Sequence, residues 1–541
     1  MKRKFTAALT ALLAISMIGC GTGGKEAATG TDTGDSKAGK TAAAEADAGN
    51  GADKNTLVVG INSTLDTLDP WSPQKPSKFF VCSVLYQSLG QAAEIGSSQL
   101  EGVLMKEWTQ IDTMTYDIEL YDSIVDTAGN PFTSSDVAFC FEKYAETNTT
   151  YVDNIEITGD YTFTMHLNSE APGSFERMCE YVYMVTEEAY NASGDGMAVK
   201  AVGTSPYQVR EFTEGAKIVL EKADSYWQTD DLNIDDYKAN VDVIEYDVLT
   251  EVTQLALAVE TGTVDIAMQV EDSALGQLEG IENLAITFTP DICSRGIMFN
   301  MTESSPFYDN LALRQAVCYA IDKESVALAC TYGYGSPSAA AYGTASQVGY
   351  NSEWENNTYS YDVEKAKELL AEAGYKEGEL NIRLLSNQNA AVKSMWEVIQ
   401  ANLAEIGINA EIILADGSSY GAWRDATSGQ YDIAYCGQDY GNYVTITWDT
   451  LYNADLRESG LTWFGLDDPK VQEQIHLLET ADGFTQENID AFYDYTTKNC
   501  YYYQIFNMDN AIVYNTDRVS GVEEAVNFNG YVQVNAVTLT K

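Results

Sequence analysis

Histidine and positive charge are scarce in this chain of 541 residues. It contains two histidines, and its 31 lysines and arginines stand against 81 aspartates and glutamates, which gives a formal net charge of −50 at pH 7. A chain this acidic is repelled by nucleic acids and by anionic lipids, so we expect no nucleic-acid partner. The surplus charge either favours cationic ligands or is ordinary solvated surface.

The common sequence motifs of catalysis and metal binding are missing as well. We find no His-Glu-x-x-His motif, no phosphate-binding loop, no dinucleotide fingerprint and no Gly-x-Ser-x-Gly elbow. His166 and His476 have no serine or cysteine partner in a recognisable motif. None of the nine cysteines forms a Cys-x-x-Cys pair, which argues against a thiolate zinc site. We therefore expect no enzyme, no cofactor and no metal site.

A short basic and apolar segment opens the chain. Positions 2–4 are basic, and the stretch from 5 to 18 is mostly apolar but too short to span a bilayer as a mature helix. This arrangement is typical of a signal peptide, which we place at residues 1–19. No later run of 18 or more apolar residues occurs, so the body is expected to be tethered rather than embedded.

Gly19-Cys20 resembles the lipobox of bacterial lipoproteins, in which the cysteine thiol receives diacylglycerol. Cys20 is therefore the predicted lipidation site, and the protein is predicted to be lipid-anchored to the outer face of the cytoplasmic membrane. Ordinary secretory cleavage beside a chance cysteine is the alternative. Residues 20–54 are predicted to be the lipidated cysteine and a flexible linker, because glycine, alanine and threonine dominate and no apolar periodicity exists.

The folded body shows the patterns of an α/β protein. Residues 56–60 and 295–300 are apolar runs typical of strands. Behind the second run, Asp309 is a candidate cap for a helix whose apolar residues recur at helical spacing from Leu313 to Ile321. A late helix is expected over residues 489–503. Helices that end at glycine and lead into strands are typical of βαβ units.

Several of these stretches resemble the family 5 extracellular solute-binding proteins. Those proteins are the binding components of ABC importers for peptides, nickel and some sugars. The most specific stretch is Phe299-Asn300 followed by Ser-Pro-Phe-Tyr-Asp-Asn-Leu-Ala-Leu-Arg-Gln-Ala-Val-Cys-Tyr-Ala-Ile-Asp-Lys-Glu-Ser-Val at residues 305–326. Further matches are Leu65–Pro70, Tyr86–Gly90, Pro131–Phe141, Gly203–Tyr207 and residues 251–270. Together they extend from about Leu57 to about Tyr514.

The resemblance implies an α/β, two-lobed periplasmic-binding-protein-like fold with a hinge and a third, smaller inserted domain. One lobe is entered three times by the chain. The implied boundaries are 55–85, 201–290 and 510–541 for lobe I, 86–200 for the inserted domain II, and 291–509 for lobe III.

The resemblance also implies that the ligand is enclosed between the lobes. The candidate ligand-binding residues are Gln74, Trp423, Tyr435, Asp439, Tyr440 and Asn442. In peptide-binding relatives, the aspartate of an Asp-Tyr pair binds the free amine of the peptide, and Asp439-Tyr440 matches that pair. Cys436 stands where those relatives carry a tryptophan. Tyr435 stands where some of them carry an arginine for the peptide carboxylate.

The expected function is therefore that of a membrane-tethered receptor. It captures an extracytoplasmic oligopeptide and delivers it to an ABC permease, acting as a monomer and without catalysis. A nickel chelate or an oligosaccharide is the alternative ligand. Purely structural roles also remain open, as a loop cap for Asp439 and as helix packing for Trp423.

Overall fold

The computed structural model describes most of the chain beyond residue 54. The described residues are 55–72, 78–94, 96–229, 232, 237–289, 293–439, 442–459, 462–527 and 530–540. The predicted signal peptide, lipidation site and linker lie outside them.

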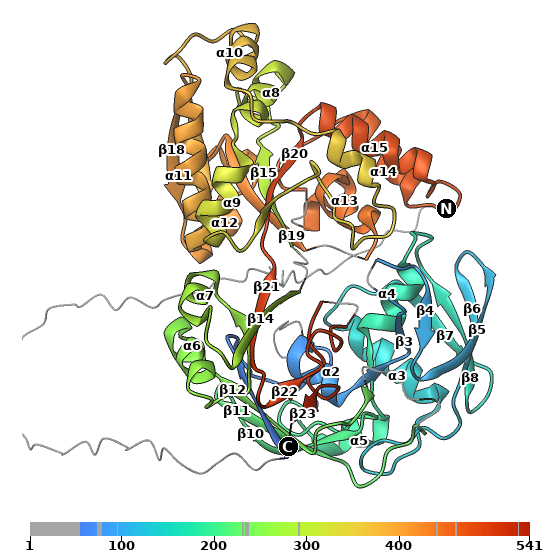
Figure 1. Ribbon diagram of the computed structural model, residues 1–541. Coiled ribbons are helices and arrows are strands. Elements are labelled where there is room, and N and C mark those ends of the chain that lie inside the picture. The colour runs from blue at the N-terminus through green and yellow to red at the C-terminus, as the bar shows by residue number, and fades with distance from the viewer. Residues whose placement is uncertain are drawn as a thin grey trace, which may run out of the picture.

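A seven-stranded sheet forms the centre of lobe I (Figure 1). Its strand order is β10 (Tyr207–Thr213), β11 (Lys217–Lys222), β12 (Val243–Val248), β1 (Thr56–Ile61), β13 (Ile266–Val270), β21 (Asn510–Asn515) and β14 (Leu284–Thr289). The predicted strand at 56–60 is confirmed as β1, which lies parallel to β12 and to β13. Helices α6 (Val252–Glu260) and α7 (Asp272–Leu278) contribute buried apolar residues against this sheet. The sheet thus gathers strands from three distant parts of the chain.

One buried carboxylate joins these distant parts. Asp265 is 4% exposed and accepts hydrogen bonds from the Val58 N–H at 3.0 Å and from Arg518 Nε at 3.0 Å. The Arg518 guanidinium also donates to the Thr56 carbonyl at 3.1 Å. Asp265 therefore connects β1, the approach to β13 and the C-terminal segment through charge-assisted hydrogen bonds.

A four-stranded antiparallel sheet forms the inserted domain. Its order is β5 (Met105–Asp112), β6 (Thr115–Leu120), β8 (Thr162–Leu167) and β7 (Val152–Ile157). Helices α3 (Ser134–Ala145), α4 (Ser174–Tyr181) and α5 (Glu187–Ser193) accompany it (Figure 1). Buried apolar residues of this domain and of lobe I belong to one continuous core cluster. The two therefore form one body, whereas lobe III has a core of its own.

Lobe III is built on a six-stranded sheet. Its order is β16 (Ser336–Pro337), β20 (Tyr502–Asn507), β15 (Cys293–Phe299), β19 (Ile433–Asp439), β17 (Asn381–Ser386) and β18 (Asn409–Leu414). The helices around it include α8 (Leu311–Ala320), α9 (Lys323–Thr331), α10 (Val363–Glu372), α11 (Ala390–Glu405), α12 (Gly417–Trp423), α13 (Val444–Tyr452), α14 (Pro469–Leu478) and α15 (Gln486–Lys498). The predicted central strand is thus β15, which pairs with both β19 and β20.

Two expectations about this lobe are wrong in detail. The cap of α8 is Asn310, whose side chain accepts from the Leu313 N–H, whereas Asp309 has a left-handed φ of 46°. The late helix, α15, ends at Lys498, and Cys500 then takes a left-handed φ of 52°. Residues 502–507 form β20 instead, because their buried side chains and backbone groups complete the sheet beside β15.

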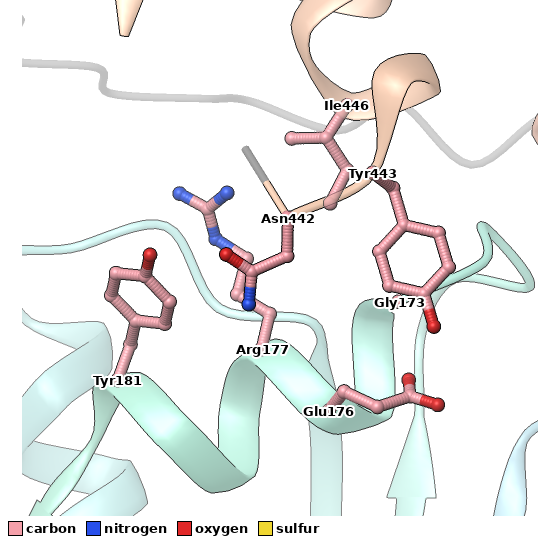
Figure 2. Close-up of a pocket in the computed structure, with 7 residues that line it drawn as sticks. All are labelled: Gly173, Glu176, Arg177, Tyr181, Asn442, Tyr443 and Ile446. Atoms are coloured by element: carbon pink, nitrogen blue, oxygen red, sulfur yellow. The ribbon is translucent and has the colours of Figure 1, made fainter. Parts of the chain in front are cut away.

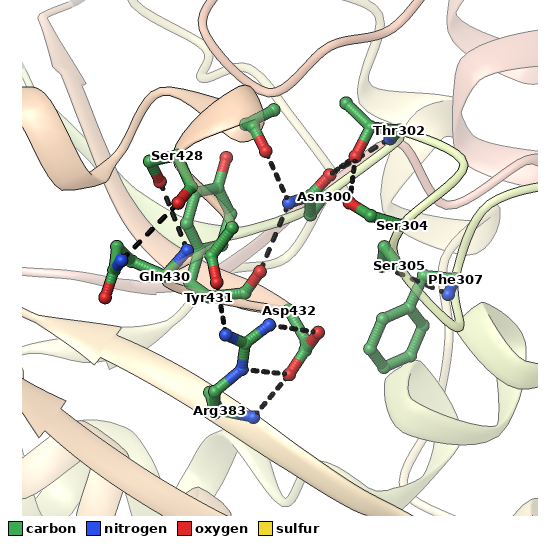
Figure 3. Close-up of polar contacts among 12 residues, drawn as sticks. Asn300, Thr302, Ser304, Ser305, Phe307, Arg383, Ser428, Gln430, Tyr431 and Asp432 are labelled. Carbon is green, nitrogen blue, oxygen red and sulfur yellow. Dashed lines mark hydrogen bonds and ion pairs between the residues drawn. The ribbon is translucent and has the colours of Figure 1, made fainter.

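A hydrogen-bond network positions β19 in this sheet (Figure 3). The Asn300 amide donates to the carbonyls of Ala426 at 3.0 Å and Tyr431 at 3.2 Å. The Asp432 carboxylate accepts from Arg383 through its backbone N–H at 2.8 Å and through Nε and Nη2, both at 3.0 Å. These contacts fix the backbone on both sides of residue 431, immediately before β19 begins, and so fix the direction of that strand.

The chain passes from lobe III to lobe I where β20 leads into β21 (Figure 1). Only Met508 and Asp509 separate β20 from β21. Short single-chain connections of this kind allow two rigid bodies to rotate relative to each other. The structure therefore has the hinge that the two-lobed fold requires.

We predict that Asp265→Ala destabilises the protein, because the Arg518 guanidinium and the Val58 N–H lose their acceptor. The expected loss in the free energy of unfolding is about 3 kcal/mol. Urea unfolding followed by circular dichroism measures it. Asp242→Ala is the matched control, because Asp242 is paired with Lys222 at an exposed site and should change stability by less than about 1 kcal/mol. Equal losses in the two variants would contradict the role given to Asp265.

Candidate functional site between the inserted domain and lobe III

A small pocket lies where the inserted domain meets lobe III (Figure 2). Its lining comes from α4 and the residue before it on one side, and from the start of α13 on the other. The lining residues are Gly173, Glu176, Arg177, Tyr181, Asn442, Tyr443 and Ile446. The cavity of about 10 Å³ holds roughly one water molecule. A larger molecule can therefore enter only if the two sides separate.

The loop at residues 442–444 is held in place by lobe III. The Val348 N–H donates to the Asn442 carbonyl at 2.7 Å, and the Val444 N–H donates to the Val348 carbonyl at 3.1 Å. This short bridge presents the Asn442 and Tyr443 side chains toward α4 (Figure 2). The loop follows β19 closely in sequence.

The start of α4 makes room for the Tyr443 ring. Gly173 precedes the helix with a left-handed φ of 85°, and a Cβ there would lie 2.4 Å from the Tyr443 Cδ2 atom. Any side chain at this position would therefore collide with lobe III. Glycine satisfies both the backbone angle and the close approach.

Asn442 and Glu180 form the hydrogen bond that joins the two sides. The Asn442 amide donates to the Glu180 carboxyl at 2.6 Å, although the two residues are 262 positions apart in the chain. Glu180 is 6% exposed. Burial, with the nearby Glu176 carboxyl, raises the pKa of Glu180 to about 8, while Asn442 and Arg177 act in the opposite direction. Burial also raises the pKa of Glu176.

The predicted ligand residues fall at several places. Asn442 lines the pocket. Asp439 ends β19 with its backbone opposite Cys293, and its side chain is outside the description. Gln74 and Tyr440 lie outside the described residues.

Tyr435 and Trp423 do not line the described pocket. Tyr435 lies in β19, opposite Ile297, and packs half-buried against the core of lobe III. Trp423 is the last residue of α12 and packs half-buried against a small cluster that contains Tyr420 and Tyr431. The packing role that the sequence left open for Trp423 is therefore observed.

Sequence reasoning missed the three side chains of α4 that line the pocket, Glu176, Arg177 and Tyr181. It also missed the buried Glu180, which accepts a hydrogen bond from Asn442 beside the pocket. Glu176, Arg177 and Glu180 lie on neighbouring turns of α4. Phe175, Met178 and Cys179 of the same helix are buried. The one available signal was a Pro-Gly pair that opens a short helix with two carboxyls and an arginine, and such a pattern is common on protein surfaces.

The described residues offer no direct metal site. They contain no group of three or more histidine, cysteine, aspartate or glutamate side chains placed to hold a metal ion. His166 lies on a surface strand with its Nε2 3.4 Å from Glu156. Among the helices that the structure describes, none combines the length and the apolar character needed to cross a bilayer.

We predict that the stability of this contact depends on pH through Glu180. The Glu180 pKa is about 8 in the folded protein and near 4.3 in an unfolded chain. Its contribution is therefore fully present below about pH 4 and is lost as pH rises toward about 8. Relative to wild type, Glu180→Gln should gain at least about 1 kcal/mol in unfolding free energy between pH 5 and pH 8.

Chemical unfolding at the two pH values measures this gain. Glu188→Gln, at an exposed position of α5, is the matched control and should follow the wild type. A pH profile of Glu180→Gln parallel to that of the wild type would show that Glu180 is ionised in the folded protein.

The sequence is similar to known proteins. Residues 99–453 match the model of the bacterial extracellular solute-binding proteins, family 5. The glutathione-binding protein GsiB of Salmonella paratyphi A is 25% identical over 383 residues, which cover 68% of this chain and 70% of that protein. These findings concern sequence alone.

Solved structures agree in fold. The ABC transporter substrate-binding protein CtaP of Listeria monocytogenes has a TM-score of 0.75 at 20% identity and covers 90% of this chain and 99% of its own. NikZ of Campylobacter jejuni, solved in complex with Ni(L-His), has a TM-score of 0.70 at 19% identity and covers 90% and 100%. The predicted two-lobed fold class is thereby confirmed. This chain belongs to the bacterial extracellular solute-binding proteins, family 5, which serve ABC importers.

Proposed function

We propose that this protein is a lipid-anchored, monomeric receptor that captures an oligopeptide between its lobes and delivers it to an ABC permease. The observation that carries the proposal is the pocket shared by α4 and by the residues at the start of α13, Asn442, Tyr443 and Ile446. In this pocket, carboxyl, guanidinium, amide and phenol groups from two rigid bodies meet. Such a set of groups complements a small zwitterionic solute rather than an apolar one.

A peptide suits this arrangement for two reasons. Its backbone N–H and C=O groups can be satisfied by main-chain hydrogen bonds at the ends of strands, while aromatic side chains cover its side chains loosely. The glutathione-binding relative GsiB gives independent support, because glutathione is itself a peptide. The fold alone does not select the ligand, since NikZ shares it and was solved with Ni(L-His).

A thermal-shift screen of the purified lipid-free protein tests the proposal. The screen contains glutathione, mixed di- to hexapeptides, nickel with histidine, and oligosaccharides. We expect peptides to raise the melting temperature, because a ligand that binds only the folded state stabilises it. Shifts with nickel–histidine or with an oligosaccharide, and none with peptides, would overturn the peptide assignment.

We predict that Asp439 binds the free amine of the peptide. An ammonium group enclosed between lobes loses its water and needs a charged partner. Asp439→Asn should therefore lower the affinity for a free-amine peptide by about two decades, since removing one partner of a buried pair costs about 3–5 kcal/mol. The affinity for the N-acetylated form of the same peptide should change little.

Calorimetry with the two forms of the peptide measures this difference. The control is Asp432→Asn, in which the carboxylate that binds Arg383 is altered and both peptide forms should respond alike. Equal affinity of the wild type and Asp439→Asn for the free-amine peptide would contradict this prediction and leave Asp439 with the role of a loop cap.

We predict that Cys20 carries the lipid. Cys20→Ser removes the thiol that receives diacylglycerol, so the variant should incorporate no labelled palmitate and should leave the membrane fraction. Ser16→Ala keeps Gly19-Cys20 intact and serves as the control. Retention of both label and membrane association by Cys20→Ser would show that the segment is an ordinary secretory signal.

A further inference from the structure

Arg177 is a charged side chain in the pocket that has no hydrogen-bonding partner among the residues that the structure describes. It lies in the middle of α4, and its guanidinium rises between Tyr181 and Asn442 (Figure 2). The guanidinium carbon lies 5.2 Å from the centre of the Tyr181 ring. Among the described residues, no hydrogen bond or ion pair is made by its five N–H donors, and the residue is half-buried.

Three other buried or half-buried arginines receive acceptors from the chain, whereas half-buried Arg424 resembles Arg177 and lies 5.5 Å from the centre of the Trp463 ring. Arg314 donates to the carbonyls of Asn499 at 2.8 Å and Phe307 at 2.7 Å. Arg383 and Arg518 each pair with a buried aspartate. No Arg177 nitrogen is among the buried side-chain atoms that lack a partner, so its N–H groups reach solvent and can accept a partner from outside the chain.

The neighbouring carboxyls do not fill this role. Glu180 is occupied by the Asn442 amide at 2.6 Å. Glu176 lies one position before Arg177 on the helix, and its side chain points away from the guanidinium toward Gly173 and Tyr443 (Figure 2). Neither forms an ion pair with Arg177 among the described contacts. The cation therefore faces the cavity with its N–H groups available.

We propose that Arg177 binds a carboxylate of the ligand, supplied by the C-terminus of a peptide or by an acidic side chain. A planar guanidinium holds a carboxylate through two parallel N–H···O bonds, and the Tyr181 ring beneath it keeps the guanidinium plane in place. Asn442, across the cavity, belongs to the other lobe, so a carboxylate bound here lies at the junction of both bodies. This inference rests on the proposed function and assigns the anionic end of the ligand to the inserted domain.

The test uses the best peptide of the thermal-shift screen in three forms. These are the free acid, the C-terminal amide, and the free acid with its acidic side chains replaced by amides. Calorimetry measures the affinity of each form for the wild type and for Arg177→Met, which keeps the apolar stem over Tyr181. Arg210→Met, at an exposed position of β10, removes the same charge elsewhere and is the matched control.

We expect the wild type and Arg210→Met to bind one of the two amide forms about ten- to a hundredfold more weakly than the free acid, the range of a hydrogen-bonded charged pair. Arg177→Met should lose that preference and bind all three forms equally. The form that the wild type discriminates against identifies which carboxylate is bound.

An unchanged preference in Arg177→Met, with the wild type binding normally, would overturn this inference and leave the receptor function intact. The absence of any peptide binding by the wild type would instead overturn the proposed function. The melting temperature of ligand-free Arg177→Met shows whether the variant is folded. If it is not, Arg177→Lys, which keeps the charge but not the two-bond geometry, should show a reduced preference in the same comparison.

Discussion

The hydrogen bond between Asn442 and Glu180 closes the space between two bodies that otherwise have separate cores. A donor from lobe III and a carboxyl from the inserted domain meet at 2.6 Å in a site where little water remains. A buried carboxyl of this kind is costly in its ionised form, and its raised pKa expresses that cost. Burial at this contact therefore disfavours ionisation of Glu180, and the contact lies outside the separate core clusters of the two bodies.

The folds on each side hold the two partners of this contact in position. Lobe I and the inserted domain share one continuous core, so α4 moves with the seven-stranded sheet. Lobe III carries the opposing loop on the end of β19, which the Asn300 and Asp432 networks hold in direction. We expect the two sides to rotate as bodies about the short connection through Met508 and Asp509, which would bring complete surfaces together. A solute that contacts both surfaces stabilises the joined state.

Much of the scaffold could be predicted from the sequence, because it follows local rules. The apolar runs of β1 and β15 and the helical spacing behind Leu313 each report a buried face. The predictions were less accurate where one local sequence pattern is compatible with two different structures. Tyr502 and its neighbours look helical in sequence but complete a sheet, since their partners on β15 lie about two hundred positions earlier. Asp309 and Asn310 both have side chains that can cap a helix, so the sequence does not distinguish them. The backbone angles decide, and Asn310 is the cap.

The site was harder to predict for the same reason. Asn442 was identified through its neighbour Asp439, whose Asp-Tyr pair resembles a known motif. Glu180 and Arg177 belong to no motif. Glu180 matters through its contact with Asn442, 262 positions away in the chain, and Arg177 through its place in the pocket beside that contact. No periodicity within a helix of eight residues can indicate which distant loop will face it.

The central claim is that the lobes close on a ligand held between them. Small-angle X-ray scattering measures it directly, as the radius of gyration with and without a saturating peptide. Gly173→Ala and Gly129→Ala provide the contrast, because both glycines have a left-handed φ but only the first faces Tyr443, while the second has nothing within 4 Å. The account predicts that the peptide reduces the radius of gyration of the wild type and of Gly129→Ala, and reduces that of Gly173→Ala less. Identical radii with and without peptide in the wild type would contradict it.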